Sequence, residues 1–86
     1  MTIHIPGALR SYTGQKSWVE AEGRTLAEVL SALDGRYPGL RFRIVTEQDR
    51  IRPHIRIFVN ETQTMTLETR LGADDQIYIV LALSGG

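Results

Sequence analysis

The last five residues of the chain, 82–86, carry the group with the clearest chemical use. Gly85 and Gly86 have no side chains, so the backbone there is thin and adopts almost any pair of φ and ψ angles. Five extended residues reach roughly 17 Å, which is far enough to carry a terminal carboxylate into a partner's active site. We therefore predict that the carboxylate of Gly86 is the reactive group. The alternative is a frayed end without function.

Ser84 and Leu83 precede the two glycines, and we expect both to contact the partner that receives the tail. A serine hydroxyl is also a candidate nucleophile. It needs a base to activate it, and no histidine or aspartate has suitable sequence spacing from Ser84. We interpret Ser84 as a small spacer.

The apolar segment 77–82 is predicted to be the strand that anchors the tail. Side chains alternate between the two faces of a strand, so Tyr78 and Val80 should oppose the apolar face of this segment. Phe58, in a predicted strand over 55–60, should lie beside them. If the helix covers the other face, these three side chains form an exposed apolar patch, and such patches mark contact sites. We predict that Phe58, Tyr78 and Val80 bind partner proteins.

A helix is predicted over 26–36. Thr25 and Glu28 have the spacing of a capping box at its start. Leu26, Val29, Leu30 and Leu33 then follow at helical spacing and form one apolar stripe. Pro38-Gly39 prevents the helix from continuing.

The remaining pattern predicts strands over 1–5 and 17–21, joined as a hairpin, and a short edge strand over 64–66. On the second strand, either Val19 and Ala21 or Trp18 and Glu20 face outward. The segment 40–45 fits a helical turn or an extended piece, and 46–50 an exposed loop. One helix on a mixed sheet of four to five strands is an α+β domain of two layers. We assign 1–81 to this domain and 82–86 to a flexible tail.

Composition excludes several classes of function. The 86 residues suit one domain, ten acidic residues balance ten basic ones, and there is no cysteine. Neither nucleic acid nor membrane binding is indicated by the charge, and no apolar run is long enough for a membrane span. We expect no signal peptide and a cytoplasmic protein. His4 and His54 lack companion ligands for a metal, and no acid–base or nucleophile constellation indicates an enzyme.

Arginines are unevenly distributed. Nine of the ten basic residues are arginine, and five of these, Arg41, Arg43, Arg50, Arg52 and Arg56, fall in one segment. Such a cluster is either a solvated surface or a polar rim that orients partners around a docking face.

The order of elements and the terminal Gly-Gly resemble the ubiquitin-like β-grasp fold, and within it the bacterial MoaD/ThiS-type sulfur carriers of molybdopterin, thiamine and cysteine synthesis. The Ile-Pro, Leu-Arg, Thr-Gly opening is most similar to the mycobacterial-type carrier for cysteine. The residues that carry the likeness are Ile5-Pro6, Leu9-Arg10, Thr13-Gly14, Thr25-Leu26, Tyr37, 57–61, Leu71, 75–77 and Gly85-Gly86. Members often have Asp-Gly-Asp before the last strand and proline after it. This chain has Ala73-Asp74-Asp75, a turn in which aspartate would tolerate a left-handed conformation, and Leu81.

The resemblance implies that an E1-like adenylating enzyme uses ATP to activate the Gly86 carboxylate, and that the chain itself binds no cofactor. A sulfur donor then converts the adenylate into a thiocarboxylate. The acceptor of that sulfur would be a cysteine synthase-like enzyme or the large subunit of molybdopterin synthase. Two alternatives stay open: a protein modifier joined through Gly86 to lysines, for which this chain offers only Lys16 as a self-acceptor, and a passive β-grasp interaction module.

Overall fold

A computed structural model describes residues 1–82 of the chain. It contains five strands, two α-helices and one 3-10 helix. In chain order these are β1 (Thr2–His4), η1 (Gly7–Thr13), β2 (Trp18–Glu20), α1 (Leu26–Arg36), α2 (Leu40–Ile44), β3 (Ile55–Val59), β4 (Thr62–Thr64) and β5 (Gln76–Leu81).

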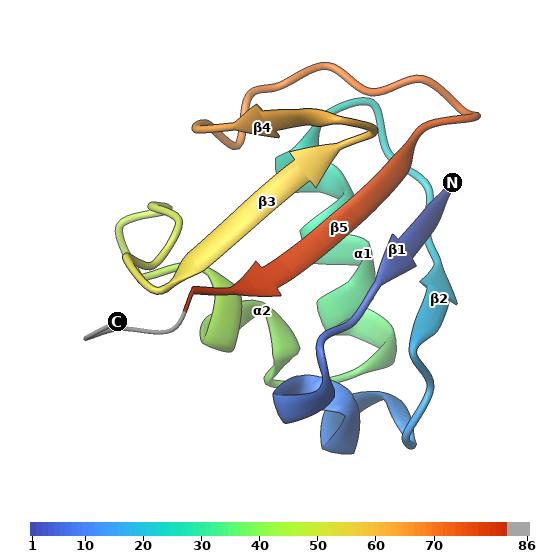
Figure 1. Ribbon diagram of the computed structural model, residues 1–86, viewed down its shortest axis with the longest axis vertical. Helices are drawn as coiled ribbons and strands as arrows, with labels where there is room; N and C mark the ends of the chain where they lie inside the picture. Colours follow the sequence, from blue (N-terminus) through green and yellow to red (C-terminus); the bar gives the residue numbers. More distant parts are fainter. Residues whose placement is uncertain (83–86) are drawn as a thin grey trace.

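The five strands form one mixed sheet in the order β2-β1-β5-β3-β4 (Figure 1). The central pair, β1 and β5, is parallel, and every other pair is antiparallel. Both α-helices lie against one face of this sheet, as Figure 1 shows with α1 behind the strands. The α+β class, the mixed sheet and the single main helix were all predicted from the sequence.

The core forms where the apolar stripe of α1 meets the covered face of the sheet. Leu26, Val29, Leu30 and Leu33 of α1 are all buried, as the 3.6-residue spacing predicts. On the sheet side, the alternate residues of each strand point into this layer: Ile3, Val19, Ile55, Ile57, Ile77 and Ile79. The alternation in β2 is thereby settled, with Val19 inward and Trp18 outward.

Helix α1 has the predicted bounds, and its capping differs from the prediction in one detail. The Glu28 amide donates to Thr25 Oγ1 at 3.3 Å, as a capping threonine requires. The Glu28 carboxylate, however, accepts from the Arg24 amide at 2.9 Å rather than from the amide of Thr25. The start of the helix is therefore tied to the turn one residue earlier.

Three short segments differ from the sequence prediction or resolve it. The segment 7–13, part of the connection within the predicted hairpin, forms η1, and the ambiguous segment 40–45 is mostly helical as α2. The edge strand β4 begins and ends two residues earlier than the predicted 64–66, because Thr62 rather than Thr66 pairs with β3, opposite Val59. Among residues 1–82, no helix is long and apolar enough to cross a membrane.

The turn before β5 is held by a carboxylate rather than by left-handed backbone. None of Ala73, Asp74 and Asp75 has a positive φ angle. Instead Asp75 accepts two hydrogen bonds, from the Gly72 amide at 2.7 Å and from Asn60 Nδ2 at 3.0 Å. These two bonds, the backbone one first, hold the pKa of Asp75 below its usual value of 3.8.

Because the pKa is lowered by folding, ionised Asp75 stabilises the fold above pH 3.8 and loses that effect as the pH falls through the lowered value. We expect Asp75→Asn to lower the urea midpoint at pH 7, and the difference from the parent to shrink below pH 3.8. Asp74→Asn, which changes an exposed neighbour, is the matched control and should leave the midpoint unchanged. A difference that stays constant across this pH range would show that the Asp75 charge is not responsible.

Candidate functional site

The face of the sheet opposite α1 carries a row of side chains that crosses all five strands. His4 on β1 is paired with Trp18 on β2 and with Tyr78 on β5. Tyr78 is paired with Phe58 on β3, which is in turn paired with Gln63 on β4. Directly paired residues share a face of a sheet, so these five side chains lie in one line on the uncovered face.

Three rings of this row pack against one another. The His4 and Trp18 rings are 4.9 Å apart between centroids, and the Trp18 and Tyr78 rings are 5.6 Å apart, both in T-shaped geometry. The His4 and Tyr78 rings lie 6.1 Å apart. Trp18 nevertheless remains 45% exposed. Edge-to-face pairs fix ring orientation, so this part of the face is a preformed surface.

Phe58, Tyr78 and Val80 lie together on the uncovered face, as the strand alternation predicted. Phe58 and Tyr78 are half-buried, and Val80 is 41% exposed. Val80 is paired with Arg56 and lies two residues closer to the tail along β5 than Tyr78 does. We call Trp18, His4, Tyr78, Phe58 and Val80 the docking face.

The sequence analysis did not place Trp18 and His4 in this patch: it left the facing of Trp18 open and considered His4 only as a metal ligand. Their part in the face depends on the parallel pairing of β1 with β5, which brings the first strand of the chain beside the last. The sequence signal was present but ambiguous, because the alternation in 17–21 allowed Trp18 to face either way.

The tail leaves the sheet beside the first residues of β3. Leu81, at the end of β5, is paired with Ile55, and the Ala82 amide donates to the His54 carbonyl oxygen at 2.8 Å. Leu83, Ser84, Gly85 and Gly86 lie outside the described residues, so the predictions for them stay predictions. The last described residue is therefore fixed at the same end of β5 as Val80.

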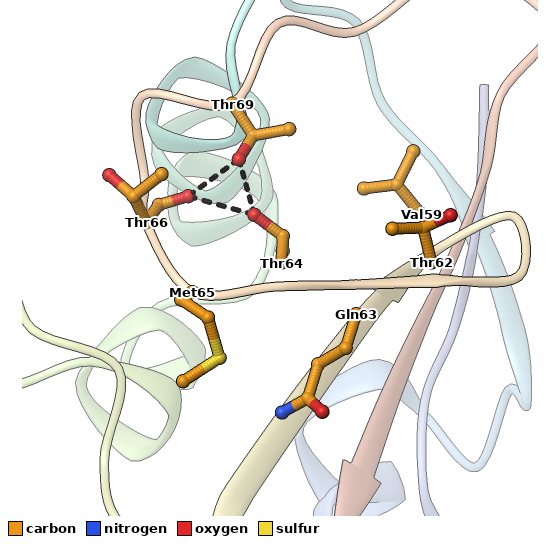
Figure 2. A pocket seen from close by; sticks show the side chains of 7 residues that line it. All are labelled: Val59, Thr62, Gln63, Thr64, Met65, Thr66 and Thr69. Carbon is orange, nitrogen blue, oxygen red and sulfur yellow. Dashed lines mark hydrogen bonds between the residues drawn. The ribbon is translucent and has the colours of Figure 1, made fainter.

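One hollow of the described chain is lined mainly by threonines. It has a volume of about 450 Å³ and lies between β4 and the segment after it, as Figure 2 shows. The Thr64 and Thr69 hydroxyls lie within hydrogen-bond distance of each other and of the Thr66 carbonyl oxygen, so these polar groups are satisfied within the hollow. Residues 1–82 contain no group of three metal-ligating side chains, so His4 and His54 do not belong to such a group there.

This architecture, one main helix across a five-stranded mixed sheet with a parallel central pair, is that of a ubiquitin-like β-grasp domain. The chain belongs to the ThiS family, whose family description matches residues 3–86. It is 31% identical to the sulfur carrier protein CysO of Mycobacterium tuberculosis (strain ATCC 25618 / H37Rv), over 100% of this chain and 98% of the relative. The resemblance to the sulfur-carrier family is thereby confirmed.

Two further relatives bear on the function. In the crystal structure of the Amycolatopsis orientalis BexX/CysO complex, the matching chain is 32% identical, with a TM-score of 0.91 over 99% of this chain and 98% of that one. Small archaeal modifier protein 3 of Haloferax volcanii is 29% identical over 100% of this chain and 98% of the relative. Homologues of this chain therefore include both sulfur carriers and a protein named as a modifier.

Proposed function

We propose that this chain is a sulfur carrier whose reactive group is the carboxylate of Gly86. An adenylating enzyme joins that carboxylate to AMP from ATP and releases pyrophosphate. A sulfur donor then displaces AMP and leaves a thiocarboxylate, which gives its sulfur to an acceptor enzyme. The observation that carries the proposal is the family match, which extends through Gly85-Gly86.

The chain's own part in this scheme is presentation rather than catalysis. Val80 of the docking face lies at the same end of β5 as the root of the tail, two residues before Ala82. A partner that binds the docking face is thus positioned to receive the residues that follow Ala82. ATP would bind to the adenylating enzyme, and this chain would act as its protein substrate.

Intact-mass spectrometry tests the proposal directly. The chain is expressed with its native neighbouring genes, purified and weighed. A mass gain equal to the exchange of one oxygen atom for one sulfur atom, which increases further by one alkyl group when a thiol-alkylating reagent is added, supports the carrier. An unchanged mass in every growth condition would overturn it.

A protein modifier is the second candidate, because a modifier is among the relatives. It would share the adenylation step but end in an amide bond between Gly86 and a lysine. Lys16 is exposed and follows the turn after η1, so one self-conjugation site is accessible. Conjugates detected in the same cell extracts, with no thiocarboxylate, would favour this function.

Charge placed on the docking face should prevent partner binding. We expect Phe58→Asp and Val80→Asp each to weaken binding to the adenylating enzyme by roughly tenfold or more, because a carboxylate in an apolar contact loses its hydration. Titration calorimetry measures the affinity, and urea denaturation verifies that the fold is retained.

Met65→Asp is the matched control for this experiment. Met65 is 80% exposed and follows β4, outside the docking face. The Met65→Asp variant should bind with the parent's affinity, since it makes a similar change in charge and hydrophobicity outside the docking face. If the Val80 variant also keeps that affinity, the docking face is assigned to the wrong surface.

A further inference from the structure

A small basic cleft lies beside the root of the tail. Phe42 and Arg43 from α2, together with Arg52 and His54 from the segment before β3, line a hollow of about 180 Å³. The Ala82 amide donates to the backbone oxygen of His54. The cleft and the point where the tail leaves the sheet therefore share a residue.

Arg52 is held in place within this cleft. Its Nε donates to the Phe42 carbonyl oxygen at 2.7 Å, and its guanidinium carbon lies 4.6 Å from the centroid of the Phe42 ring. Its own amide donates to the Ile44 carbonyl oxygen at 3.0 Å. A stacked, anchored guanidinium keeps a fixed orientation, and its two terminal nitrogens then form a fork that suits a carboxylate.

The charge around the cleft is largely uncompensated within the described chain. Within the segment 41–56, the structure of residues 1–82 contains one ion pair, which joins Arg41 to Asp49 at 2.7 Å. Arg43 and Arg52 have no carboxylate within ion-pair distance there. Phe42, beneath the Arg52 guanidinium, remains 54% exposed, so the stacked pair faces outward rather than into the core.

The size of the cleft selects the kind of occupant. Small-molecule and cofactor sites usually enclose about 300–1,000 Å³, and this hollow is smaller. A single side chain fits it, and its cationic lining selects a carboxylate. The occupant that suits both size and charge is an aspartate or glutamate of another protein.

We propose that this cleft receives an acidic side chain of the adenylating enzyme and so fixes the root of the tail as the carboxylate enters the active site. The inference rests on the proposed function. The adenylating enzyme is the partner chosen because every use of the Gly86 carboxylate, in a carrier or in a modifier, begins with its activation. Arg43 and Arg52 of the arginine cluster then make a specific contact at the tail, in addition to any steering role of the cluster.

ATP–pyrophosphate exchange, catalysed by the adenylating enzyme of the host organism, tests the inference. We expect Arg43→Glu combined with Arg52→Glu to raise the KM for this protein roughly tenfold or more, with kcat within about twofold, because an interfacial charge pair is replaced by repulsion. Raising the salt from 0.1 M to 1 M should shrink the difference, since the screening length falls from about 10 Å to about 3 Å. Arg52→Lys should raise KM less, because it keeps the charge and loses the fork.

Arg24→Glu combined with Arg70→Glu makes the same change in net charge elsewhere. Both residues are exposed, and they lie near the start of α1, away from the end of β5 that carries the tail. The KM for this double variant should stay within about twofold of the KM for the parent, since exposed charges far from a contact contribute little. Equal KM values for both double variants would overturn the inference alone. A parent protein that supports no exchange would overturn the proposed function and this inference with it.

Discussion

A variant that lacks Gly86 is expected to form no detectable thiocarboxylate. Deleting one residue withdraws the terminal carboxylate by about 3.3–3.6 Å, while the docking face and the root of the tail stay where they are. A displacement of about 1 Å at a reacting centre can already cost 10²-fold in rate. We therefore expect at least a 100-fold loss of ATP–pyrophosphate exchange with the variant as substrate.

Adding one alanine after Gly86 is the complementary change, because it moves the carboxylate outward and adds a side chain. It should lose activity to a similar extent. The matched control is Met65→Ala, which keeps the tail intact and changes an exposed residue outside the docking face. Both tail variants should keep the parent's affinity for the adenylating enzyme to within about tenfold, because the folded contact surface is unchanged. A truncated chain that is activated at the parent's rate would exclude Gly86 as the reactive residue.

Local signals in the sequence were sufficient for α1 and for the faces of β3 and β5. Thr25 caps the helix through its own side chain, and the leucine stripe requires only the helical period. On β5, the alternation placed Tyr78 and Val80 opposite Ile79, as the structure has them. Each of these features depends on residues close together in the chain, which is why a pattern predicts them.

Features that depend on distant residues were not predictable in the same way. Helix α2 begins at Leu40, and its start is stabilised by Asp34 of α1, whose Oδ1 accepts from the amides of Gly39 and Arg41 at 3.1 and 3.2 Å. No periodicity in five residues indicates such a cap.

The candidate site was predictable in part for the same reason. Phe58 and Tyr78 follow from alternation in two predicted strands, but their direct pairing requires the register between β3 and β5. Trp18 and His4 join the docking face only through the parallel pairing of β1 and β5. The arginine cluster was visible in the sequence, whereas the stacking of Arg52 on Phe42 is a tertiary contact.

The central position of β5 links stability to function in this domain. It is bonded to β1 on one side and to β3 on the other. Its inward residues complete the core under α1, while its outward residues supply the middle of the docking face, and its end leads to the tail. The strand that leads to the tail is thus hydrogen-bonded along both edges, so its position is fixed from both sides.

Adjacent residues of β5 should therefore separate the two roles. Ile79 is fully buried, and Ile79→Ala is expected to lower the free energy of unfolding by about 2–5 kcal/mol, because it removes buried methyl groups and leaves a cavity. For a domain of this size, that loss lowers the melting temperature by roughly 4–8 °C for each kcal/mol. Urea denaturation and calorimetry measure the effect.

Val80→Ala changes the next residue, on the uncovered face, and is the matched control. Val80 is 41% exposed in the parent. The variant should therefore lower the free energy of unfolding by less than about 1 kcal/mol, since few methyl contacts of Val80 are buried. Its affinity for the adenylating enzyme should nevertheless fall, whereas folded Ile79→Ala, measured well below its melting temperature, should bind as the parent does. If Val80→Ala destabilises the fold more than Ile79→Ala does, the assignment of Ile79 to the core and Val80 to the docking face is wrong.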